Sequence, residues 1–247
     1  MDLGIDGRVA LVMGASKGIG AAVARELAAE GARVAVASRS AGPLQELAAE
    51  IGASAFVHDN ADLDAVPALI AAVTAALGPV EILVTNTGGP PSGPDPLAFS
   101  REQWELAHRT LVLAPIELIG AVVGGMRERG WGRIVNVGSL TVREPMSILV
   151  LSNSERAAAL AAFKTIAAEV AASGVTLNTV LPGRIGTERL HELLGGTPPE
   201  AIAAEVPVGR LGTPEELAAA IAFLCSERAS YITGVALLVD GGLARLV

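Results

Sequence analysis

Short runs rich in valine, isoleucine and leucine alternate with longer helical patterns along the whole chain. Seven of these runs are predicted as β-strands, at 8–13, 33–38, 54–58, 81–85, 133–138, 175–181 and 236–239. Apolar strands that alternate with helices are typical of βαβ units, which close on one parallel sheet buried on both faces. The sequence therefore predicts an α/β fold in which helices cover both faces of a parallel sheet.

Helical patterns fill the segments between the strands. Six helices are predicted, at 19–30, 43–51, 63–77, 101–129, 155–173 and 214–226, and glycines follow five of them, at Gly31, Gly52, Gly78, Gly130 and Gly174. Glycine is the residue that most often ends a helix, so the positions of these glycines agree with the predicted helix ends. No repeat, linker or change in composition divides the chain, which predicts one domain over residues 1–247.

Charge and cysteine content exclude several classes of protein. Lys and Arg total 18 against 26 for Asp and Glu, a net charge of −8, so neither nucleic acid nor an anionic membrane is expected as a partner. Cys225 is the single cysteine, and His58, His108 and His191 lie far apart in the sequence, which predicts no disulfide and no metal site. A reduced, cytoplasmic location is the expectation.

The mean hydropathy of +0.50 raises the question of a membrane span. The best candidate, 111–126, contains Pro115 and Glu117 and is too short to cross a bilayer. The first six residues hold two acids and no base before the first strand, unlike a secretory signal. We therefore assign the hydrophobicity to alanine-rich helices that cover a buried sheet.

The segment 14–20, GASKGIG, follows the first predicted strand and opens the first helix. Its glycines permit a tight turn and the close approach of a pyrophosphate, while the helix N-terminus offers free N–H groups. A plain strand-to-helix connection is the alternative, but a position at the start of a βαβ series favours dinucleotide binding. The predicted cofactor-binding residues of this turn are Gly14, Ser16, Lys17, Gly18, Ile19 and Gly20.

The residues after the second strand bear on which dinucleotide is bound. An acidic residue there would accept from the ribose 2′-hydroxyl of NAD, but this chain has Ser38, Arg39 and Ser40, and Lys17 lies in the glycine turn. Two cations near a 2′-phosphate favour NADP, with NAD still possible. The alternative is that Lys17 and Arg39 are ordinary solvated cations.

Several ordered motifs resemble those of the short-chain dehydrogenase/reductase family, and most of all its 3-oxoacyl-(acyl carrier protein) reductase-like group. The motifs are MGASKGIG at 13–20, with Met13 where threonine is usual, EILVTNTG at 81–88, LPGRIGT at 181–187, PVGRLGTPEE at 207–216, ASYITG at 229–234 and VDGG at 239–242. The resemblance covers essentially the whole chain. It implies a single doubly wound Rossmann domain with a seven-stranded parallel sheet.

The resemblance also implies further cofactor contacts and an assembly. It places Asp59 against the adenine, and the 182–187 loop over the nicotinamide. Its remaining cofactor-binding candidates are Asn60, Asn86, Gly88, Pro182, Gly183, Ile185 and Thr187. In the family, helices corresponding to 101–129 and 155–173 build a dimer interface, so we expect a homodimer or homotetramer.

The family's catalytic tetrad is only partly kept. Ser139 matches its serine, but Ser152 stands at the place of the tyrosine, Arg156 at that of the lysine and Leu111 at that of the asparagine. The only tyrosine, Tyr231, lies in the C-terminal motif, where a buried structural role is expected. A serine hydroxyl is a far weaker acid than a phenol, and a guanidinium is not equivalent to an ammonium.

Ser139, Ser152 and Arg156 are the catalytic candidates, and each has a structural alternative or a changed role. Ser152 and Glu155 match a capping box at a helix start. Ser139 could satisfy the end of its strand, while Arg156 could bind ribose hydroxyls.

Two functions therefore remain open. One is NADP-dependent reduction of a small carbonyl compound, or oxidation of an alcohol, at an atypical site. The other is a non-catalytic relative that binds a dinucleotide as a sensor or partner subunit. The segment 188–205, expected to line the pocket, selects no substrate class.

Overall fold

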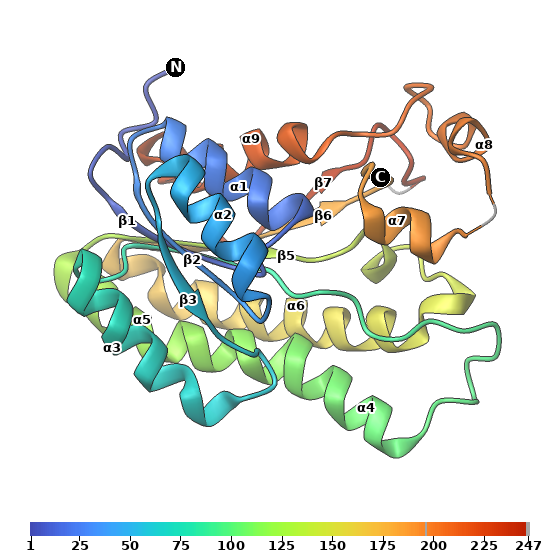
Figure 1. The fold of residues 1–247 in the computed structure, drawn as a ribbon, viewed down its shortest axis with the longest axis horizontal. Helices are drawn as coiled ribbons and strands as arrows, with labels where there is room; N and C mark the ends of the chain where they lie inside the picture. Colours follow the sequence, from blue (N-terminus) through green and yellow to red (C-terminus); the bar gives the residue numbers. More distant parts are fainter. Residues whose placement is uncertain (196, 246–247) are drawn as a thin grey trace.

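A seven-stranded parallel sheet forms the centre of the computed structural model, which describes residues 1–195 and 197–245 (Figure 1). The strand order is β3-β2-β1-β4-β5-β6-β7. The strands are β1 Val9–Met13, β2 Arg33–Ser38, β3 Ser54–Val57, β4 Ile82–Thr85, β5 Gly132–Val137, β6 Val175–Pro182 and β7 Ala236–Val239. The chain runs outward from β1 in one direction and then, from β4, in the other. This is the doubly wound order, with its switch point between β1 and β4, and it confirms the predicted fold.

Helices cover both faces of the sheet (Figure 1). One face carries α1 Gly18–Ala29, α2 Ala41–Ile51 and α9 Pro214–Leu224, and the other carries α3 Val66–Leu77, α4 Arg101–His108, α5 Ala114–Arg129 and α6 Val150–Val170. Two short helices, α7 Glu188–Leu193 and α8 Pro199–Ala204, lie beyond the carboxyl edge of the sheet. The central strands are apolar because they are covered on both sides.

Alternate residues of β1 enter two separate cores. Ala10 and Val12 pack with α1 and α9 on one face, whereas Val9, Leu11 and Met13 pack with α3, α5 and α6 on the other. All five side chains are buried. Because side chains alternate along a strand, one short apolar run supplies both layers of the fold.

Strand boundaries agree with the sequence prediction within one residue, but several helices differ from it. Helix α3 begins at Val66 rather than at 63, and α7 and α8 lie where no helix is predicted. Helix α6 begins at Val150 rather than at 155, because the turn Ser147–Leu149 leads directly into it. The predicted helix 101–129 is continuous but contains a π-helical turn, Arg109–Leu113, between α4 and α5. Such turns insert one extra residue and are frequent near functional sites. Leu111 lies buried within this turn.

The segment Arg101–Arg129 is long and apolar enough to cross a membrane by length and composition alone, with a mean hydropathy of 1.6. In the fold, 44% of its apolar window is buried. Leu118, Val122 and Met126 pack in the core beneath the sheet. This packing accounts for the hydropathy of the segment.

Candidate functional site

The glycine turn after β1 forms a cradle at the carboxyl edge of the sheet. Gly14 and Gly18 have φ angles of +61° and +57°, which favour glycine. A Cβ on Gly20 would lie 2.3 Å from the Gly14 carbonyl oxygen, and one on Gly14 would lie 2.6 Å from the Asn86 carbonyl oxygen. Lys17 precedes α1 without a side-chain cap, so the first N–H groups of the helix are free for an anion. These features fit a dinucleotide pyrophosphate.

Asn86 ties this turn to the next strand. Its Nδ2 donates to the Gly14 carbonyl oxygen at 3.2 Å. Beyond it, Gly88 is exposed in the loop after β4, with no atom within 4 Å of where a Cβ would lie. Within the turn itself, Ser16 is half-buried, and Ile19 packs against the core from the first turn of α1.

The ends of β2 and β3 carry the residues predicted for the adenosine half of the cofactor. The hydroxyl of Ser38 is buried and has no hydrogen-bond partner among the described residues, and Arg39 beside it is exposed. Asp59 accepts from the Ala61 N–H at 2.9 Å, and Asn60 Nδ2 donates to Thr87 Oγ1 at 2.6 Å. An orphaned hydroxyl next to an exposed guanidinium fits a phosphorylated ribose.

The loop after β6 lies over the glycine turn. Pro182 ends the strand, and a Cβ on Gly183 would lie 2.6 Å from the Cβ of Asp240. Gly186 N–H donates to the Gly212 carbonyl at 2.8 Å, and Ile185 is buried. Thr187 Cγ2 is 3.6 Å from where a Cβ on Gly18 would lie. The loop therefore reaches the start of α1.

Lys17 is not a free cation in this arrangement. Its ammonium pairs with the Glu188 carboxylate at the start of α7, which raises the pKa of Lys17 and lowers the pKa of Glu188. Both side chains are largely exposed, so the ion pair is open to exchange with solvent or with a ligand. While the pair persists, the nearby cation left for a 2′-phosphate is Arg39.

Arg156 lies between the carboxyl ends of β4 and β5. Its Nη1 donates to the Val137 carbonyl at 2.8 Å and its Nη2 to the Thr87 carbonyl at 3.1 Å. Burial, with a smaller contribution from Arg189, lowers the pKa of Arg156 to about 10. The hydrogen bonds fix the guanidinium at the same sheet edge as the glycine turn.

The two candidate serines both precede Arg156 along the chain. Ser139 follows β5, and its hydroxyl lies 2.9 Å from Thr141 Oγ1 and accepts from the Thr141 N–H at 3.2 Å. Ser152 is buried in the first turn of α6, one helical turn before Arg156. Leu111, at the position predicted for the family's asparagine, has no polar side chain with which to order a water.

The predicted capping box at Ser152 is wrong. Because α6 begins at Val150, Ser152 lies inside the helix and cannot cap it. Glu155 instead meets His108 of α4, with 2.8 Å between Glu155 Oε2 and His108 Nδ1. The helix starts early because Asn153 Nδ2 donates to the Met146 carbonyl at 2.8 Å and anchors the first turn to the preceding loop.

The expectation of a buried role for Tyr231 is also wrong. Its side chain is fully exposed, with a relative accessibility of 102%. It follows the short turn Glu227–Ala229 and precedes the edge strand β7, so no helix covers it.

Sequence reasoning missed three residues of the site. Thr87 accepts from both Asn60 and Arg156, Thr141 holds Ser139, and Arg189 of α7 donates to the Pro90 carbonyl at 2.9 Å. The contacts of Thr87 are partly to its backbone, which carries no sequence signal. Arg189 lies in a segment without a recognisable pattern.

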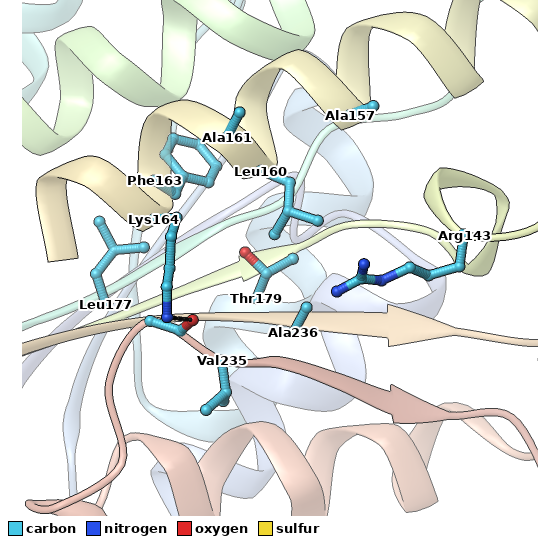
Figure 2. Close-up of a pocket in the computed structure, with 11 residues that line it drawn as sticks. Arg143, Ala157, Leu160, Ala161, Phe163, Lys164, Leu177, Thr179, Val235 and Ala236 are labelled. Atoms are coloured by element: carbon cyan, nitrogen blue, oxygen red, sulfur yellow. Dashed lines mark hydrogen bonds between the residues drawn. The ribbon is translucent and has the colours of Figure 1, made fainter. Parts of the chain in front are cut away.

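A hollow of about 360 Å³ lies elsewhere, between α6 and strands β6 and β7 (Figure 2). Most of its lining residues are apolar, and its polar side chains are those of Arg143, Lys164 and Thr179. Lys164 Nζ donates to the Gly234 carbonyl at 2.9 Å. None of the predicted cofactor or catalytic residues lines this hollow, so it is distinct from the site described above.

The profile of a protein family described as enoyl-(acyl carrier protein) reductase matches residues 14–244. The chain belongs to the short-chain dehydrogenase/reductase family. Among its relatives in this family, the acetoacetyl-CoA reductase of Rhizobium meliloti is 38% identical over 240 residues, which cover 95% of this chain and 98% of that protein. The 3-oxoacyl-[acyl-carrier-protein] reductase of Vibrio cholerae is 37% identical over 245 residues, covering 98% and 99%.

Solved structures of short-chain dehydrogenases/reductases share the same fold. L-sorbose reductase from Gluconobacter frateurii, complexed with NADPH and L-sorbose, superposes with a TM-score of 0.92 at 34% identity and covers all of both chains. The predicted family and fold are confirmed, and the chain is by family an NAD(P)-dependent oxidoreductase. The predicted NADP cofactor agrees with the NADPH of this neighbour.

Proposed function

We propose that this short-chain dehydrogenase/reductase is an NADPH-dependent carbonyl reductase, able to run in reverse as an alcohol dehydrogenase, whose site lacks the family's tyrosine and lysine. The observation that carries the proposal is the position of Arg156. Its guanidinium is fixed between the ends of β4 and β5, at the edge where the glycine cradle lies. A cation at this position supports a retained binding site for the nicotinamide end of the cofactor, although the residue is arginine rather than the family's lysine.

NADPH supplies the hydride when bound, and the chain supplies binding and polarisation. Ser139, held by Thr141, is placed to donate a hydrogen bond to the substrate carbonyl oxygen. Arg156 has N–H groups beyond the two that bind carbonyls, and these can hold ribose hydroxyls. Ser152 is too weak an acid to replace a phenol, so a water or the substrate provides the proton. Without a positioned acid we expect turnover to be slower by about 10²–10⁴.

The substrate proposed is a ketone, of which 3-oxoacyl thioesters are the first to test. Relatives named acetoacetyl-CoA reductase and 3-oxoacyl-[acyl-carrier-protein] reductase support this class. A cytoplasmic location is proposed with it.

The missing phenol favours a second candidate function, a non-catalytic relative that binds the dinucleotide as a sensor or partner subunit. The only tyrosine, Tyr231, follows Glu227–Ala229 and precedes β7, whereas Ser152 lies in α6.

Calorimetric titration with NADPH and NADH, followed by spectroscopic measurement of cofactor oxidation, separates these functions. We expect tighter binding of NADPH, because Arg39 is exposed beside the orphaned Ser38 hydroxyl. We also expect slow oxidation of NADPH with 3-oxoacyl thioesters or simple ketones. Tight NADPH binding without turnover of any ketone would favour the sensor or partner subunit, and the absence of dinucleotide binding would contradict both.

A homodimer or homotetramer is proposed as the assembly. The edge strand β7 exposes Leu237, Val235 lies exposed just before it, and Tyr231 is nearby in the chain. The hollow of Figure 2 borders this edge and the outer face of α6, where Ala157 and Ala161 are exposed. An apolar edge strand beside an apolar helix face is a surface that a second copy can cover.

Replacing Leu237 with aspartate is expected to shift the assembly toward smaller species, because the charge would be buried at the contact. Light scattering at micromolar concentration measures the change. Leu97→Asp is the matched control, since Leu97 is 92% exposed and lies in the loop before α4, away from β7. A monomeric wild-type protein, or an unchanged mass for Leu237→Asp, would contradict the proposed interface.

A further inference from the structure

Two arginines hold the loop that follows β4 from different elements. Arg156 of α6 donates to the Thr87 carbonyl at 3.1 Å. Arg189 of α7 donates to the Pro90 carbonyl at 2.9 Å, and its Nη2 lies 3.0 Å from where a Cβ on Gly89 would lie. The two guanidiniums therefore meet the same short loop, at carbonyls three residues apart.

Arg156 has no carboxylate partner among the described residues, and Arg189 has only an exposed one on its own helix. No acidic side chain lies within ion-pair distance of Arg156, and the nearest to Arg189 is the exposed carboxylate of Glu192 at 3.8 Å. Repulsion from Arg189 adds to burial in lowering the pKa of Arg156. Arg189 is exposed, whereas the guanidinium of Arg156 is half-buried without a counter-ion, which is costly, so this place favours an anionic ligand.

Two other cations near the site already have carboxylate partners. Arg184, on the loop after β6, pairs with Glu205 at 3.1 Å, and Lys17 pairs with Glu188. Lys17 lies beside the glycine turn, which fits the pyrophosphate, whereas Arg156 is tied to Val137, two residues before Ser139. The positive charge of Arg156 therefore lies toward the catalytic candidates, whereas that of the exposed Arg39 lies at the adenosine end of the site.

We propose that the substrate is an oxo acid, a ketone whose carboxylate pairs with Arg189 and Arg156. This inference rests on the proposed reductase function and names its substrate class. Guanidinium and carboxylate groups form paired, charge-assisted hydrogen bonds, which supply both affinity and orientation. Arg189 lies on α7, directly after the loop that reaches the glycine turn, so carboxylate binding would also hold this loop near the substrate.

The chemistry balances without a further reactant. The carbonyl carbon accepts a hydride from NADPH, the C=O π bond breaks and water protonates the resulting alkoxide. The products are a hydroxy acid, NADP⁺ and hydroxide. The carboxylate forms no covalent bond and serves only for recognition.

Binding to the NADP⁺ complex tests recognition separately from turnover, because NADP⁺ has no hydride to give. Acetoacetate and acetoacetamide, which differ in the charge of one end, are titrated calorimetrically into the protein saturated with NADP⁺. We expect acetoacetate to bind roughly 10–100-fold more tightly. Arg189→Gln is expected to remove most of this preference, while Arg189→Lys retains part of it.

Arg127→Gln is the matched control, because it removes one positive charge near the end of α5, where Arg127 pairs with Glu169. It is expected to leave both affinities unchanged. Equal binding of the two compounds, or equal weakening of both by Arg189→Gln, would overturn the inference and leave Arg189 as a positioning residue for the loop. If NADPH binds and neutral ketones are reduced without a preference for the acid, only this inference fails. If neither NADP⁺ nor NADPH binds, the proposed function fails and this inference fails with it.

Discussion

A variant that combines Ser152→Tyr with Arg156→Lys is expected to reduce a neutral 3-oxoacyl thioester about 10²–10⁴ times faster than the wild-type protein. The expected gain comes from a positioned acid, which the proposed site lacks. A phenol has an unperturbed pKa near 10, and a nearby ammonium lowers it toward neutrality. A neutral substrate is chosen because Arg156 is also part of the proposed carboxylate site.

The structure places both substitutions suitably. Ser152 is buried in the first turn of α6, and the half-buried Arg156 lies one turn later. The carbonyls of Val137 and Thr87, which now accept from Arg156, remain available to a lysine ammonium. Ser139 stays in place to polarise the substrate carbonyl.

The matched control combines Ser152→Phe with Arg156→Lys. It has nearly the same volume as the tyrosine variant but no hydroxyl, so its turnover is expected to stay at the wild-type level or below. Steady-state rates of NADPH oxidation compare the three proteins, and calorimetry verifies that each binds NADPH. Equal rates for the tyrosine and phenylalanine variants would show that the missing acid is not what limits this site.

Much of the fold could be predicted because its signals are local. Each strand is a short apolar run, and glycines end helices at Gly52, Gly130 and Gly174 in the left-handed conformation. The early start of α6 could not be predicted, because it depends on the contact between Asn153 and the Met146 carbonyl. The serine and glutamate that matched a capping box had the right spacing but lie within the helix.

Part of the candidate site could likewise be predicted from the sequence, and part could not. The glycine turn and the loop after β6 have sequence motifs, so their residues could be named in advance. The pairing of Lys17 with Glu188 joins residues 171 positions apart, and that of Arg189 with the Pro90 carbonyl joins residues 99 apart. Such contacts form only when the loops meet over the carboxyl edge of the sheet, so no local sequence pattern predicts them.

Gly20→Val is expected to abolish measurable NADPH binding, with at least a 100-fold rise in Kd, and to lower the free energy of unfolding by about 1–3 kcal/mol. A Cβ at this position would lie 2.3 Å from the Gly14 carbonyl oxygen and 2.9 Å from Asn86 Nδ2. The closer atom belongs to the backbone, so no side-chain rotation relieves the clash. The glycine turn and the start of α1 must separate, which disperses the N–H groups that would bind the pyrophosphate.

Two further variants separate crowding from general damage. Gly120→Ala adds a methyl group in open space within α5, so NADPH affinity is expected to match the wild type. Gly18→Ala has room, since Thr187 Cγ2 is 3.6 Å away, but its φ of +57° imposes a cost of about 1–2 kcal/mol. Calorimetry and urea denaturation should therefore place Gly18→Ala between Gly120→Ala and Gly20→Val. Unchanged NADPH affinity in Gly20→Val would show that the glycine turn does not bind the cofactor, because its geometry cannot survive this substitution.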